Sequence, residues 1–238
     1  MCKLFKRAVL GSATAFLVAC GGGGGGDVAP DTTQYPVQAA LTAAYTNGLE
    51  KTLSITGTAS DGFVTYPVSG TMRLALSPAI HTTLNGLDVL QVTETIDGSL
   101  TVNGQIGPLT STSTSYLTMT FSPVVYDSTG TYCEADAPIV YPATLMVNQS
   151  GDLGTFHCYS DSSKITPVGS ETSSYATSPG RVAQTLDVRV ITTLYDASHV
   201  QLATGSLTYN VTAAGVPSIS QFQMTQVDGG ITVQMTGQ

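Results

Sequence analysis

Imidazole and thiol groups are the side chains that most often act as general bases, nucleophiles and soft metal ligands in proteins. The 238-residue chain has three histidines, His81, His157 and His199, which lie far apart in the sequence. None belongs to an HExxH motif, and no GxSxG motif precedes a helix-forming segment. We therefore expect a protein that is not an enzyme, without catalytic residues, and a hydrolase is the least favoured alternative.

Acidic residues are the other candidates for chemistry, because carboxylates can bind calcium. Asp127, Glu134 and Asp136 lie close together in the sequence, with Gly130 among them. Calcium needs six or more oxygen ligands, and the chain has no segment of the DxDxDG type. We expect these residues to be solvated loop acids, and we expect neither a metal nor a cofactor.

The first twenty residues have the composition of an export signal. Three basic residues, Lys3, Lys6 and Arg7, precede a short apolar stretch at residues 8–19. As a helix, this stretch would span only about 18 Å, well short of a hydrocarbon layer of about 30 Å. It is therefore typical of the apolar region of a cleaved secretory signal rather than of a transmembrane helix.

The end of this signal, Leu17-Val18-Ala19-Cys20, resembles the lipobox of bacterial lipoproteins. The resemblance implies that residues 1–19 are removed and that Cys20 becomes the first residue, carrying a diacylglyceryl group and an amide-linked acyl chain such as palmitate. In Gram-negative members, an Asp directly after the cysteine marks retention in the inner membrane. Because Gly21 occupies that position, we expect a lipid-anchored protein of the bacterial cell envelope, sorted to the outer membrane.

The residues after the signal divide into a tether and a domain. Residues 20–35 comprise the acylated cysteine and a glycine-rich segment without apolar periodicity, which predicts a flexible tether, and residues 36–238 form a β-rich domain. Without the signal, five basic residues remain against sixteen acidic ones. This charge argues against nucleic acid and against electrostatic docking on anionic lipid. The membrane is then reached through the covalent lipid on Cys20, and a protein or glycan partner stays open.

The signal and the lipid anchor account for two of the four cysteines. Cys2 leaves with the signal and Cys20 is acylated, so Cys133 and Cys158 remain. An even pair in an exported chain predicts a disulfide, and closing a loop of this length contributes about 3 kcal/mol in the chain-entropy treatment. A catalytic thiol is disfavoured because neither cysteine lies in a CxxC motif. A zinc site would need more ligands than these two cysteines and His157.

Alternating apolar and polar residues, with frequent Thr, Val and Ile, predict β-strands through most of the domain. We expect one hairpin to turn at Ser60-Asp61-Gly62 and another at Asp97-Gly98. The last third repeats the pattern in strands near 186–193, 200–211, 219–227 and 231–235. This spacing predicts an all-β, mainly antiparallel meander in a β-sandwich or a partly open barrel.

Two segments depart from this pattern. Residues 169–180 are polar without periodicity, so we expect a long loop there or a boundary between two subdomains, although one continuous domain is simpler. Near the start, Val37, Ala40, Leu41 and Ala44 recur at helical spacing. Pro36 can open this short helix and Gly48 can end it, and the helix would pack as a plug or lid against the sheet.

These features favour a non-enzymatic lipoprotein that binds or scaffolds something at the outer membrane. One alternative is a carrier that holds a hydrophobic ligand in a β-cavity. Another is a carbohydrate-binding module, because sugars stack on aromatic rings and five tyrosines lie in or beside the cysteine-containing third of the chain. These are Tyr116, Tyr126, Tyr132, Tyr141 and Tyr159. A closed apolar cavity would favour the carrier, and a tyrosine-lined groove would favour the sugar.

Overall fold

The computed structural model describes residues 32–238. The predicted signal at 1–19, Cys2, Cys20 and most of the tether lie outside the described residues. Within residues 32–238 the chain forms one α-helix followed by thirteen strands. The elements are α1 (Val37–Asn47), β1 (Leu49–Ser60), β2 (Thr65–Leu76), β3 (Ile80–Leu84), β4 (Leu87–Val102), β5 (Gln105–Leu117), β6 (Pro123–Ser128), β7 (Thr131–Ala135), β8 (Ser150–Tyr159), β9 (Pro167–Pro179), β10 (Thr185–Asp196), β11 (Gln201–Thr212), β12 (Pro217–Asp228) and β13 (Ile231–Gly237).

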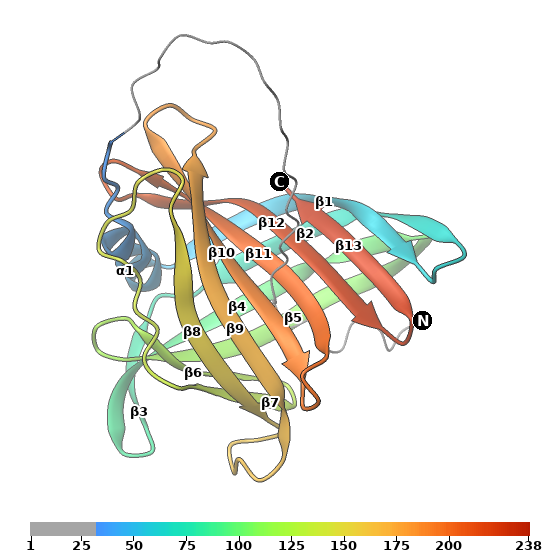
Figure 1. Ribbon diagram of the computed structural model, residues 1–238, viewed down its shortest axis with the longest axis horizontal. Helices are drawn as coiled ribbons and strands as arrows, with labels where there is room; N and C mark the ends of the chain where they lie inside the picture. The colour runs from blue at the N-terminus through green and yellow to red at the C-terminus, as the bar shows by residue number, and fades with distance from the viewer. Residues whose placement is uncertain (1–31) are drawn as a thin grey trace.

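All the strands belong to one antiparallel sheet that closes on itself (Figure 1). From β4 to β13 each strand pairs with the next, and β13 pairs with β1, which pairs with β2. The ring is completed by β2, which pairs with β4 from Val68–Val102 to Leu76–Glu94. In the described part of the chain, β3 pairs only with β4 and lies outside the ring. The predicted all-β antiparallel meander is confirmed, and the sheet forms a closed barrel rather than a sandwich or a partly open barrel.

The strands place apolar side chains inside the barrel, as the period of two in their sequences requires. One cluster fills the part of the lumen bounded by β1, β2, β4, β12 and β13, where Leu53, Met72, Leu100, Phe222 and Met235 are buried together. Two smaller clusters lie around α1, and a fourth surrounds the disulfide. The first hairpin turns at Asp61 as predicted, because its carboxylate accepts hydrogen bonds from the backbone of Phe63 and Val64.

Helix α1 forms where its sequence predicts, and it packs against the sheet (Figure 1). The four residues that recur at helical spacing, Val37, Ala40, Leu41 and Ala44, are buried, and the helix ends at Asn47, directly before Gly48, whose φ of 76° favours glycine. The first part of the helix packs on Leu145, β10 and β11, while Tyr45 packs on β4 and β5. The helix therefore bridges two walls of the lumen.

Asp97-Gly98, expected to form a hairpin turn, lies instead in the middle of the unbroken strand β4. The chain turns at Asn103-Gly104, where both residues have positive φ. Gly98 is needed for close approach, because a Cβ atom there would lie 2.1 Å from the backbone oxygen of Thr71 on β2. A Cβ atom on Gly70 would likewise lie 2.0 Å from the oxygen of Ser99. These two glycines bring β2 and β4 together at the junction that closes the ring.

Residues 169–180, expected to form a long loop or a boundary, make up most of β9. This strand pairs along its length with β10 on one side and β8 on the other. The sheet is therefore continuous across the predicted boundary. The polar composition of the segment reflects serine and threonine side chains on a strand that is paired on both sides, and of the two residue types threonine favours a pleated surface.

We predict that Gly70→Ala lowers the free energy of unfolding by about 2 kcal/mol or more, because the added methyl group meets backbone that cannot rotate away. Thermal or denaturant unfolding of the full chain measures this change. The matched control is Gly107→Ala on β5, where nothing lies within 4 Å of the added Cβ atom. Equal stability of the two variants would contradict the role of Gly70 at the junction.

Candidate functional site

A cavity of about 210 Å³ lies inside the barrel. Its walls come mainly from β4–β6 and β8–β11, together with Ile139 and Tyr141 from the connection between β7 and β8. The lining includes two carboxyl groups, those of Glu94 and Glu171. Hydroxyl groups of serine, threonine and tyrosine form much of the remaining polar surface. These include Ser111, Ser113, Ser115, Ser173, Tyr126, Tyr141 and Tyr209.

Strand alternation explains why these polar groups face inward. On β4, Glu94 lies between Val92 and Ile96 in the series of alternate residues that face the lumen, and both neighbours are buried. On β5, Ser111, Ser113 and Ser115 follow buried Leu109 at steps of two and precede buried Leu117. The small serine side chains leave space that larger apolar residues would fill, so the local sequence of β5 itself creates part of the cavity.

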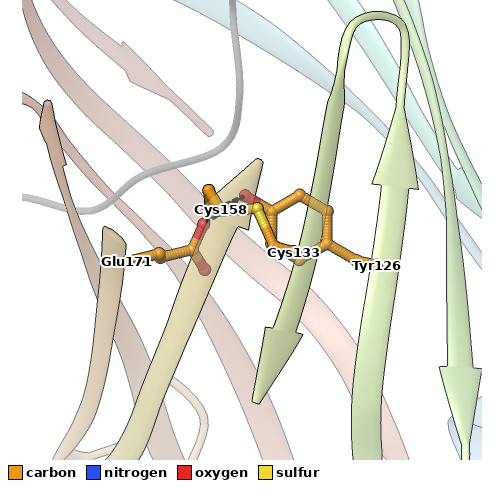
Figure 2. The surroundings of a disulfide bond; sticks show 4 residues. All are labelled: Tyr126, Cys133, Cys158 and Glu171. Atoms are coloured by element: carbon orange, nitrogen blue, oxygen red, sulfur yellow. Dashed lines mark hydrogen bonds between the residues drawn. A yellow bond between two sulfur atoms is a disulfide. The ribbon is translucent and has the colours of Figure 1, made fainter. Parts of the chain in front are cut away.

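Glu171 on β9 is held by Tyr126 on β6, beside the disulfide (Figure 2). The Tyr126 hydroxyl donates a hydrogen bond of 2.9 Å to Glu171 Oε2 and lies 3.7 Å from Cys158 Sγ. The Tyr126 ring also packs edge-on against Phe156, with 5.6 Å between the ring centroids. Glu171 is only 7% exposed, so this hydrogen bond connects a buried carboxyl group to a fixed ring.

Glu94 has a different environment. The side chain of Glu94 is half-buried, because it lines the cavity, and it lies between the buried residues Val92 and Ile96 on the inward face of β4. Burial raises the pKa of Glu94 to about 7. Burial also raises the pKa of Glu171 to about 8; the hydrogen bond from Tyr126 opposes this rise and the charge of Glu94 adds to it.

Three further tyrosines lie near the two carboxyl groups: Tyr45 and Tyr209 near Glu94, and Tyr141 near Glu171. Tyr45 from α1 has its pKa raised by burial first, and then by the charges of Tyr141, Tyr209 and Glu94. Burial also raises the pKa of Tyr141 to about 12 and that of Tyr209 well above its usual value. These phenols stay neutral at physiological pH, so the carboxyl groups are the charged or chargeable groups of the cavity. Among the lining residues, all in the described part of the chain, there is no lysine, arginine or histidine.

The predicted disulfide between Cys133 and Cys158 is confirmed, and it joins directly paired residues of β7 and β8. It lies next to the cavity through its contact with Tyr126. Two of the five tyrosines singled out from the sequence, Tyr126 and Tyr141, line the cavity. The other three, Tyr116, Tyr132 and Tyr159, are not among its lining residues. Cys20, the predicted acylation site, lies outside the described residues.

The three histidines lie away from the cavity. His157 on β8 forms an exposed pair with Asp136 at 2.9 Å, and His81 on the outer strand β3 lies 3.8 Å from Asp88. The third, His199, is in the turn between β10 and β11.

The acidic residues considered as calcium ligands do not form one cluster. Glu134 pairs with Lys164, whereas Asp136 pairs with His157. Asp127 lies on β6, and burial raises the pKa of its carboxyl group. Within residues 32–238, no three potential metal ligands come together.

Sequence reasoning did not single out Glu94 and Glu171. For Glu94 a signal was present, because the residue shares one face of its strand with Leu90, Val92 and Ile96. A charged residue in an otherwise apolar inward series marks a functional candidate, since isolated buried charges are unfavourable. For Glu171 no such signal exists, because its neighbours in the series are Ser173 and Tyr175.

We predict that the stability of the protein falls as pH rises from about 4.5 to about 8. In this range the unfolded chain has lost the protons of Glu94 and Glu171, while the folded state still binds them, so unfolding becomes more favourable with rising pH. For each carboxyl group the loss is on the order of 2–3 kcal/mol. Denaturant unfolding at pH 5 and pH 8.5 measures it.

The variant Glu94→Gln/Glu171→Gln should lack most of this fall and be more stable than the native chain at pH 8.5. Glu50→Gln is the control, because Glu50 is an exposed residue paired with Arg73 on the outer surface, where the hydrogen bond from Arg73 lowers the pKa of Glu50. An identical pH dependence in the double variant and the native chain would show that the two carboxyl groups are not buried as described.

No family model, no curated protein and no solved structure matches this chain. Within residues 32–238, no helix combines the length and the apolar character needed to cross a bilayer.

Proposed function

We propose that this chain is a non-enzymatic lipoprotein of the bacterial envelope, anchored at the outer membrane through Cys20, and that it binds a small polar ligand inside its barrel. The observation that carries the proposal is the cavity, in which two carboxyl groups and several hydroxyl groups face a space inside an otherwise apolar lumen. Small-molecule sites typically combine an apolar wall with a few converging polar groups.

The sequence and the disulfide support the anchor and the compartment. The signal-like residues 1–19 and the glycine-rich segment after Cys20 precede Tyr35, which makes a short bridge with Leu145 at the start of the barrel domain. A tether of this composition separates a lipid anchor from a rigid domain. A disulfide suits an oxidising compartment such as the periplasm.

The chemistry of the lining favours a polar ligand over the two binding alternatives. A lipid carrier needs an apolar pocket of several hundred Å³, whereas this cavity is about 210 Å³ and has Glu94 and Glu171 in its wall. A carbohydrate-binding module that stacks sugar chains needs exposed rings, whereas Tyr126 and Tyr141 lie inside the barrel. A hydrolase is not favoured either, because the histidines lie away from the cavity serines.

We predict that Cys20→Ala releases the protein from the membrane fraction into the soluble fraction of the envelope, because attachment depends on the acylated sulfur. Metabolic labelling with a fatty acid, followed by fractionation, measures both effects. Cys2→Ala is the matched control, since Cys2 would leave with the signal, and it should keep the label and the membrane location. Labelling that persists in the Cys20→Ala protein would contradict the anchor.

We also predict that ligand binding depends on the free space beside Ser113. Thermal unfolding of the full chain is measured against a panel of monosaccharides, amino acids and amines. At least one compound should raise the melting temperature of the native chain but not that of Ser113→Phe, which fills the cavity. Thr112→Phe, on the exposed face of the same strand, should respond like the native chain. A panel without any compound of this behaviour would count against binding in the lumen.

A further inference from the structure

We infer that the ligand of this cavity is a small organic cation, an amine or a guanidinium compound, held between Glu94 and Glu171. The inference rests on the proposed function and names the chemical class of its ligand. It depends on three features of the cavity: its charge, its open hydrogen-bond acceptors and its aromatic walls.

The charge of the lining is unbalanced. Glu94 and Glu171 both face the cavity, and the described lining residues contribute no basic side chain. A buried carboxylate without a compensating charge is unfavourable, so proteins normally pair such groups with a cation or keep them protonated. A ligand that carries positive charge supplies the missing partner, and a ligand that carries negative charge is excluded by the same two groups.

The carboxyl oxygens that remain open are acceptors. Tyr126 occupies Oε2 of Glu171, and among the described residues no hydrogen bond or ion pair engages the carboxyl group of Glu94. An ionised carboxylate accepts hydrogen bonds and donates none. The ligand must therefore bring N–H or O–H donors, and an ammonium or guanidinium group brings both the donors and the charge.

Aromatic rings surround the same space. Tyr126, Tyr141 and Tyr209 line the cavity, and Tyr45 of α1 lies close enough to interact with Tyr141 and Glu94. The face of an aromatic ring carries partial negative charge and attracts cations. The ring of Tyr126 is also held in place by Phe156 and by its hydrogen bond to Glu171, so it needs little reordering when a ligand binds.

Binding of a cation must be coupled to proton release. The titratable groups that face the two carboxyls are Tyr45, Tyr126, Tyr141 and Tyr209, together with each carboxyl itself, and the tyrosines stay protonated at neutral pH. A cation lowers the pKa of a nearby carboxyl group, so Glu94 and Glu171 give up protons to solvent as the ligand enters. A neutral ligand that accepts hydrogen bonds from protonated carboxyls would bind better at low pH.

Three probes with the same four-carbon backbone separate these possibilities: 1,4-diaminobutane, 1,4-butanediol and succinate. Each is titrated into the full chain at pH 8 and about 0.15 M salt, followed by calorimetry in two buffers of different ionisation enthalpy. We expect the diamine to bind with proton release, and we expect the diol and succinate not to bind. Diamine affinity should fall roughly 10- to 100-fold for each carboxylate replaced in Glu94→Gln and Glu171→Gln. It should also weaken at pH 5.5.

Glu50→Gln is the control for loose association of a cation with the acidic surface, and it should bind the diamine as the native chain does. Equal diamine binding in the Glu94→Gln/Glu171→Gln variant would overturn the inference, because the amine would then lie elsewhere. So would proton uptake on binding, or the absence of diamine binding.

The panel experiment with Ser113→Phe distinguishes the two proposals. The diol or a sugar could bind in a manner that depends on Ser113 while the diamine does not bind. In that case the proposed site for a polar ligand remains, and only the inference that its ligand is a cation falls. If no probe and no panel compound requires the space beside Ser113, both proposals fall together.

Discussion

Hydrogen bonds between β2 and β4 turn an antiparallel meander into a closed ring. Strand β3, which pairs with β4, lies outside this ring. Without this junction, both strands would expose unpaired backbone groups along their edges. Gly70 and Gly98 make the junction possible, because any larger side chain would collide with the backbone opposite. Closure then forces every inward-facing side chain to pack within one shared lumen.

The width of that lumen explains the helix and the cavity together. Eight strands enclose a space that their own side chains fill, and much larger barrels leave open channels. This barrel has an intermediate number of strands, and α1 occupies part of the excess space by packing on β10 and β11 with its first turns and on β4 and β5 through Tyr45. The inward serines of β5 leave the rest unfilled. The space that remains is bounded by tyrosines and by the carboxyl groups of Glu94 and Glu171, and the disulfide lies beside it in contact with Tyr126.

Keeping Glu94 and Glu171 in this space destabilises the folded protein near neutral pH, because burial favours their neutral forms. Apolar residues at the same positions would extend the existing clusters and would not have this effect. Groups that reduce stability in an otherwise consistent core are typical of sites that serve a function. A positively charged ligand would offset this loss of stability.

Features that depend on near neighbours could be predicted from the residues alone. Local periodicity predicts the strands β10 to β13 and the helix, whose apolar residues Val37, Ala40, Leu41 and Ala44 precede Gly48. The number of cysteines left after the signal predicts the disulfide between Cys133 and Cys158. Asp97-Gly98 could not be predicted, because glycine suits both a tight turn and a close approach between strands, and the position of Thr71 decides between them. The cavity could not be predicted from the sequence either. Glu94 and Glu171 lie on strands with four others between them in the sheet, and only the curvature of a closed ring makes both face one space.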